Sequence, residues 1–344
     1  MPTFIVGSAP RFTRVVVQPE SSAGAYYRAG RENAARAHGF PAESGLNLHF
    51  FGGKTIEKLT FTNIYLGGKA AWSPDDVTNI DNALSGAIGD PHLNNVLAQY
   101  FADGNPTGTF KPSRILEGKL APKIYRNTIE SFVTSLDQAN GLSGFDLTST
   151  VFCFMLPAGT VLVDGVSSSH AEHHEDDDDD DGDEKPKHNP ALAEKDEASD
   201  SKHGLGGYHG SVHAKHGSKK DIVYYAVGVY SEGANGIVAF DKPWKNVCAT
   251  FYHELCEART DPDIEDAIAA GDTAAADKFI GWYSDKGGEI GDIPMDEAGS
   301  NLGLIMKEVK IAGSSTKVPI QLMWSNAVGG PEGPIATKHK TSPH

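Results

Sequence analysis

The chain is poor in cysteine, which removes several classes of small, covalently stapled or thiolate-bound protein. Its 344 residues include three cysteines, Cys153, Cys248 and Cys256. The number is odd and no pair has the Cys-x-x-Cys spacing, which excludes a disulfide framework and a thiolate zinc knuckle. We therefore expect three buried free thiols, and free thiols favour a reducing compartment.

Long apolar runs and concentrated positive charge are also missing. No stretch approaches the roughly 18 apolar residues that a membrane helix needs, so we predict no membrane span. The first residues lack a basic start followed by an apolar core, so we expect no secretory signal. There is no glycine-rich phosphate loop, and no basic stripe interleaved with aromatic residues, which argues against nucleic acid as a partner.

Negative charge is abundant, but it is concentrated in one segment. The formal net charge is −16, and residues 171–200 hold 14 acidic residues against three lysines, which accounts for −11 of it. The segment 167–220 includes a run of six aspartates at 176–181 and cannot bury enough apolar surface to offset its ordering entropy. We predict a flexible acidic insertion that is solvated, with loose cation buffering beside His173 and His174 as a further hypothesis.

The rest of the chain predicts one α+β domain, a mixed central sheet flanked by helices. Alternating or continuous apolar runs predict strands within 46–50, 58–66, 151–163, 221–230, 304–311 and 318–324. Helical spacing predicts helices after Ser73, at 91–101 and at 127–140. The predicted organisation is a leader (1–43), the first part of the domain (44–166), the insertion (167–220), the second part (221–330) and a tail (331–344).

The stretch that carries most of the chemistry is "FYHELCEARTDP", residues 251–262, on a helix predicted from about Lys245 to Thr260. Positions i and i+4 of a helix project from the same face, so His253 and Glu257 can bind one ion. An imidazole and a carboxylate suit zinc or a similar divalent metal. Glu254 stands where the zinc peptidase helix His-Glu-x-x-His has its general base, although Glu257 replaces the second histidine.

A third ligand must come from elsewhere in the chain. The loop "GGEIGD" offers Glu289 and Asp292, Asp261 follows one turn after Glu257, and His209 lies between glycines in "GGYHG". The sequence leaves these four open, and it also allows His209 to steady an oxyanion.

Two other interpretations of the helix compete with a zinc site. Cys248, Phe251, Tyr252, Leu255 and Cys256 form an apolar stripe, so His253 and the two glutamates could simply border the solvent. Carboxylates outnumber histidines in the cluster, and calcium prefers oxygen ligands, so a calcium site is the alternative metal.

Six segments, taken in order, resemble the EXORDIUM or phosphate-induced protein family and its microbial relatives. They are "LNLHFFGGK", the helical stretch after "WSPDDV", "VFCFMLPAGTVLVDG", "GGYHG", "YYAVGVY" and "YHELCEARTDP". The microbial relatives are similar in their His-Glu-x-x-Glu-x-x-Thr-Asp-Pro, Trp-Tyr and Gly-Glu-Ile-Gly-Asp segments, which are here residues 253–262, 282–283 and 288–292. The resemblance implies that the helix and the loop belong together.

The resemblance and the residues of the helix imply two different functions. Plant members of the family are extracellular proteins linked to growth and lack the His-Glu pair, which suggests a non-catalytic binding or structural protein with carbohydrate or cell-surface partners. The residues themselves predict a zinc-dependent hydrolase, a metallopeptidase with Glu254 as base, His209 as helper and His253, Glu257, Glu289 and Asp292 around the metal.

Overall fold

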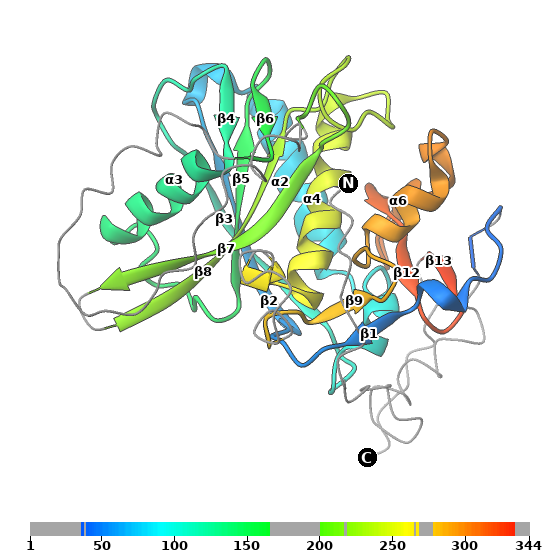
Figure 1. Cartoon of the computed structure of the whole chain (residues 1–344). Coiled ribbons are helices and arrows are strands. Elements are labelled where there is room, and N and C mark those ends of the chain that lie inside the picture. Colours follow the sequence, from blue (N-terminus) through cyan, green and yellow to red (C-terminus); the bar gives the residue numbers. More distant parts are fainter. Residues whose placement is uncertain are drawn as a thin grey trace, which may run out of the picture.

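The central element of the fold is a mixed sheet of five strands. A computed structural model describes residues 36–37, 39–165, 200–216, 219–264, 266–267 and 278–333, and gives only the backbone for residues 214–216 and 219–220. The strand order is β3-β2-β5-β8-β7 (Figure 1). The strands are β3 (Thr107–Ile115), β2 (Lys58–Tyr65), β5 (Thr150–Leu156), β8 (Lys219–Val229) and β7 (Gly207–His216).

Four of the five strands are parallel, and β7 runs antiparallel to β8. Every residue of β5 is buried, as expected for a central strand covered on both faces. Its alternate side chains enter two separate cores. Val151, Cys153 and Met155 join one core, while Phe152 and Phe154 join the other.

Three long helices cover the two faces of the sheet. Helices α2 (Pro74–Gly89) and α4 (Pro243–Thr260) contribute to the first core, and α3 (Arg126–Gln138) contributes to the second (Figure 1). Helix α2 begins as predicted, because Ser73 accepts a hydrogen bond from the Asp76 amide and Pro74 occupies the first turn. These elements confirm the predicted α+β class, with a mixed sheet flanked by helices.

Short elements complete the described structure. Strand pairs are β1 (Leu48–Phe50) with β9 (Trp282–Ser284), β4 (Lys123–Tyr125) with β6 (Val161–Val163), β10 (Met306–Lys310) with β11 (Lys317–Gln321), and β12 (Met323–Ser325) with β13 (Gly330–Glu332). Helical pieces are α6 (Asp292–Ala298) and the 3-10 turns η1 (Ser44–Leu46), η2 (Lys69–Ala71), η3 (Asn95–Tyr100) and η7 (Leu302–Leu304).

The structure corrects two local predictions. The run "VFCFMLPAGTVLV" predicts a pair of strands joined by Pro-Ala-Gly, but β5 and β6 do not pair with each other, because β5 lies between β2 and β8 while β6 pairs with β4. The helix predicted at 91–101 is instead a 3-10 helix over Asn95–Tyr100. Its side chains are all buried, so tertiary packing rather than helical periodicity sets its conformation.

The predicted boundaries of the insertion and the tail are also wrong at one end each. Residues 200–216 were predicted to be part of a flexible acidic insertion, yet they include β7, which pairs with β8 along ten positions. The predicted tail starts inside β13, whose Glu332 is buried. Most of the predicted leader and of the acidic segment lies outside the described residues.

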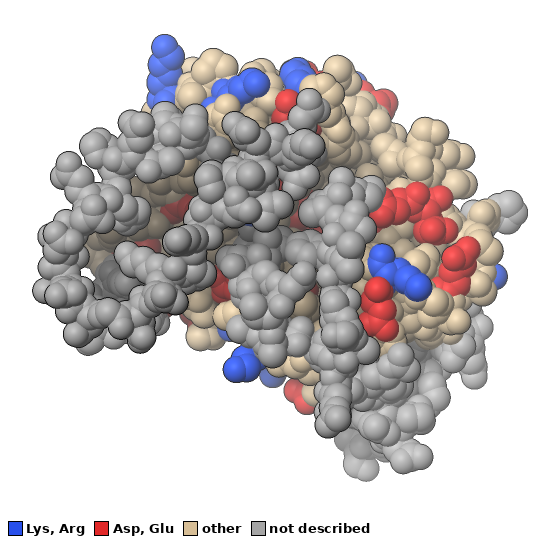
Figure 2. Space-filling model, viewed as in Figure 1, with Lys and Arg blue, Asp and Glu red and all other residues tan. Residues whose placement is uncertain are grey.

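The described residues contain no helix that combines the length and apolarity required to cross a bilayer. On the face shown in Figure 2, lysine and arginine side chains are scattered, while aspartate and glutamate side chains gather on the right.

A buried arginine fixes the C-terminal end of α4 against the sheet. Arg259 is fully buried and donates to the carbonyls of Glu57 at 2.5 Å and Thr107 at 3.2 Å, and its guanidinium lies 5.4 Å from the Phe101 ring centre. These contacts join the helix to the starts of β2 and β3. The end of α4 that carries the acidic residues is therefore held in place by the sheet.

Replacement of this guanidinium should destabilise the protein strongly. We expect Arg259→Met to lower the free energy of unfolding by about 3 kcal/mol, because buried carbonyls lose their donors. Urea denaturation measures this, and Lys242→Met, at the exposed start of α4, should change it by less than about 0.5 kcal/mol. Similar values for the two variants would contradict the anchoring role.

Candidate metal centre

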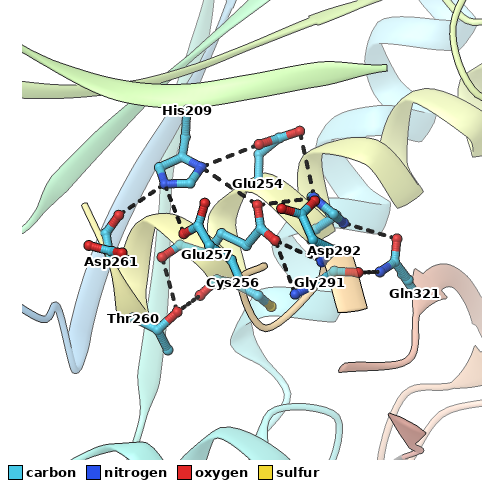
Figure 3. Close-up of polar contacts among 11 residues, drawn as sticks. His209, Glu254, Cys256, Glu257, Thr260, Asp261, Gly291, Asp292 and Gln321 are labelled. Atoms are coloured by element: carbon cyan, nitrogen blue, oxygen red, sulfur yellow. Dashed lines mark hydrogen bonds and ion pairs between the residues drawn. The ribbon is translucent and has the colours of Figure 1, made fainter. Parts of the chain in front are cut away.

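The candidate site lies where helix α4 packs against the edge strand β7. His209 projects from β7 toward Glu254 and Glu257 of α4 (Figure 3). Its Nδ1 lies 3.4 Å from Glu254 Oε2 and 3.7 Å from Glu257 Oε2. The side chains of all three residues are at most 5% exposed. The prediction that the two glutamates border the solvent is therefore wrong.

The second histidine of the site is on α4 itself. His253 Nε2 lies 3.0 Å from Glu257 Oε2, as expected for residues four apart on a helix, and 4.0 Å from Glu254 Oε1. Asp292, at the start of α6, brings its Oδ1 to 3.6 Å from the same nitrogen. Its side chain is 51% exposed, so this half of the site opens to solvent.

Glu257 belongs to both halves of the site. Among the described residues, two groups of three bring potential ligand atoms within 4.8 Å of one another: His209, Glu254 and Glu257, and His253, Glu257 and Asp292. The other oxygen of Glu257, Oε1, accepts hydrogen bonds from the amides of Gly291 and Asp292, each at 3.0 Å. These bonds leave Oε2 to face both histidines.

The loop reaches Glu257 because residue 291 is glycine. A Cβ at Gly291 would lie 2.5 Å from His253 Nδ1 and 2.9 Å from Glu257 Oε1, closer than side-chain carbons approach such atoms. The glycine thus allows a backbone amide to bind the carboxylate directly.

In each histidine ring one nitrogen faces the glutamate carboxylates of α4 (the inner nitrogen) and the other faces away from them (the outer nitrogen). The hydrogen bond of the outer nitrogen determines this orientation. His209 Nε2 lies 3.0 Å from the carbonyl oxygen of Asp261, which can only accept. His253 Nδ1 lies 3.0 Å from Gln321 Oε1. In both rings the inner nitrogen therefore needs a second proton or a cation, because otherwise a lone pair would face a carboxylate.

The charges of the site shift its pKa values in opposite directions. Burial alone would lower the pKa of His209, but its hydrogen bond to Glu254 and the charges of Glu257 and Glu254 raise it to about 9. Burial alone would raise the pKa of Glu257, but the His253 charge, the bond to His253 and the His209 charge hold it below its usual value. Glu257 is therefore the ionised carboxylate that the two imidazoles share.

Two further carboxyl groups lie at the inner end of the site. Burial raises the pKa of Asp261 to about 8, although a hydrogen bond from the Gly281 amide, at 2.9 Å, acts to lower this pKa. Burial and the charges of Glu257 and Asp261 raise the pKa of Glu289 well above its usual range. Asp261 Oδ2 and Glu289 Oε1 are buried and form no hydrogen bond. The site is rich in carboxylate oxygens that only a proton or a cation would satisfy.

The structure gathers the sequence-predicted residues, but not all in the expected places. His253, Glu257 and Asp292 meet at one point, with Glu254 beside them. Glu289 belongs to neither group of three, since its Oε1 lies 3.6 Å from the outer nitrogen of His209. His209 lies among the carboxylates of the site, and its Nε2 is hydrogen-bonded to the Asp261 carbonyl oxygen. Gln321 completes the site and was not singled out from the sequence, whereas Gly291 is one of the glycines of the "GGEIGD" loop, which are expected to let the backbone approach closely.

The three cysteines take no part in the site. All are free and buried, as predicted. Burial raises the pKa of each thiol, with Cys256 reaching about 12, so none is ionised near neutral pH.

Comparisons of the chain with protein-family models, with curated proteins and with solved structures gave no match. The resemblance to the EXORDIUM family therefore stays a prediction. The geometry of the site carries the functional argument by itself.

Without a bound cation, the protein should lose stability as pH rises. The folded pKa of Asp261, about 8, lies above its ordinary 3.8, and that of His209, about 9, lies above 6.5. Both groups bind protons more tightly in the folded state, so their stabilisation is complete below the ordinary pKa and is lost as pH passes the folded one. We expect a smaller free energy of unfolding in EDTA at pH 8.5 than at pH 5, by urea denaturation.

The matched variant is Asp261→Asn, which keeps an acceptor for the Gly281 amide. It cannot ionise, so it should flatten the decline between pH 5 and pH 8.5. A wild-type protein of equal stability at the two pH values would contradict the assigned pKa directions.

Proposed function

We propose that the protein is a metal-dependent hydrolase, with zinc as the ion and a peptide or related polymer as the substrate. One observation carries the proposal: His253 binds Gln321 Oε1 through its outer nitrogen and turns its inner nitrogen toward Glu257 Oε2. Histidine ligands of zinc are held in this way by outer hydrogen-bond partners. Nitrogen donors also favour zinc over calcium, which prefers oxygen.

The ligands we assign are His253, Glu257 and Asp292. A catalytic zinc has three protein ligands and an open position, and this group opens to solvent through Asp292. The alternative group of His209, Glu254 and Glu257 is closed, since its side chains are at most 5% exposed. An ion there would also occupy the carboxylate that serves as the base.

When bound, zinc would act as a Lewis acid and lower the pKa of a coordinated water. Glu254 accepts the proton of the attacking water, because its Oε1 lies 4.0 Å from His253 Nε2, beside the assigned ligands. His209 donates to Glu254 Oε2 at 3.4 Å and holds this carboxylate in place. Protonated His209 also adds a positive charge next to the site, which favours negative charge on the reacting carbonyl oxygen.

Metal content with single-ligand variants tests the proposed site. We expect about one zinc per chain in the purified protein, as for a mononuclear site, measured by elemental mass spectrometry. His253→Ala and Asp292→Ala should lose most of it. His209→Ala should retain it, as should the control His49→Ala, whose partner is Asp285 at the surface. Loss of zinc from His209→Ala with retention in Asp292→Ala would place the ion in the buried group and contradict our assignment.

A variant of the base separates catalysis from metal binding. Glu254→Gln should retain the metal and lower turnover of a quenched peptide library by a factor of about 10² to 10⁴, since proton transfer by a positioned base contributes about that much. The control is Glu130→Gln, which should leave turnover unchanged. Glu130 lies on α3, and this helix packs on the opposite face of the sheet, in the second core. Full activity of Glu254→Gln would remove Glu254 from the mechanism.

A second candidate function is a non-catalytic binding or structural protein of the EXORDIUM type, with calcium or with no metal. The excess of carboxylates favours it, since Glu289 and Asp261 lie beside the same histidine as the two glutamates of α4. The metal analysis distinguishes the two, because bound calcium, or no metal in the purified protein, would support the binder.

A further inference from the structure

We propose that Gln321 is a positioning residue, which determines the nitrogen that His253 presents to the metal. The inference rests on the proposed function. It extends the site to strand β11, 68 residues beyond His253 in the sequence. Gln321 is 1% exposed, at the end of a strand that packs against α4.

The orientation of the Gln321 amide follows from its second partner. Its Nε2 donates to the Gly291 carbonyl oxygen at 2.6 Å. If the amide were reversed, its oxygen would face that carbonyl oxygen, and two acceptors would repel. Gln321 Oε1 must therefore face His253, 3.0 Å from Nδ1. In the neutral ring Nδ1 then carries the proton, and the lone pair of Nε2 is left to bind the metal.

Gln321 and Gly291 join the two ligands of α4 in a closed ring of contacts. His253 Nδ1 donates to Gln321. Gln321 donates to the Gly291 carbonyl, and the Gly291 amide donates to Glu257 Oε1 (Figure 3). The remaining atoms, His253 Nε2 and Glu257 Oε2, lie 3.0 Å apart. The ring orients both atoms toward one point, which reduces the entropy lost when an ion binds.

Two variants of similar size separate the hydrogen bond from packing. Gln321→Met fills the site but cannot accept from His253, whereas Gln321→Glu keeps the acceptor for His253 and loses the donor to the Gly291 carbonyl. Val318→Ala, a buried change on the same strand, controls for a general loss of stability. The first measurement is the zinc affinity of the full chain, by competition with a chelator. The second is the tautomer of His253, from long-range proton–nitrogen spectra of protein labelled with ¹⁵N-histidine and loaded with zinc, assigned with His253→Ala.

We expect Gln321→Met to bind zinc about 10 to 100-fold more weakly than wild type, the range typical for loss of an outer partner of a ligand. Gln321→Glu should bind zinc more tightly than Gln321→Met, because it keeps the acceptor for His253, and Val318→Ala should stay close to wild type. In wild type and Gln321→Glu, His253 should bind through Nε2 with a proton on Nδ1, and in Gln321→Met this signal should weaken or divide between the two nitrogens.

Three results would overturn the inference, and they differ in what they mean for the proposed function. Wild-type zinc affinity and an unchanged Nε2 signal in Gln321→Met would remove the positioning role and leave the metal site intact. Equal losses in Gln321→Met and Gln321→Glu, with no change of tautomer, would reduce Gln321 to packing. A wild-type chain that binds no zinc would overturn the proposed function and the inference together.

Discussion

The arrangement of the site depends on one buried carboxylate, Glu257. Its Oε1 is held by two backbone amides and its Oε2 faces both histidines. A buried anion is costly unless it is paired and hydrogen-bonded, and here loop, helix and strand each supply a partner. The loop at 291–292 and strand β7 are thereby fixed relative to α4, which makes this region rigid enough to bind an ion.

Two glycines make this approach of backbone to side chains possible. Gly291 brings its amide to Glu257, and on β7 a Cβ at Gly207 would lie 2.4 Å from the Val227 carbonyl oxygen and 3.2 Å from Glu254 Oε1. Side chains at either position would separate the loop or the strand from α4. The two glycines therefore allow the loop and strand β7 to pack closely against α4, and this packing brings the charged side chains of the site together.

The C-terminal end of α4 supports the site. Arg259 ties the helix to β2 and β3, and strands β5, β7 and β8 form the base on which α4 lies. Functional groups on rigid elements keep their geometry better than groups on free loops. The half-exposed Asp292 lies at the open side of the site, and under the proposed function it is the ligand that borders the solvent.

Local chemistry in the sequence determined the helix of residues 243–260, the i to i+4 pair of His253 and Glu257, the cap at Ser73 and the buried strand β5. Spacing within one element is sufficient for such features. Only the tertiary structure decided that β7 belongs to the sheet, that His209 meets the glutamates 45 residues away and that Gln321 contacts His253. Strand pairing and contacts between distant segments depend on packing and register, which no local pattern specifies.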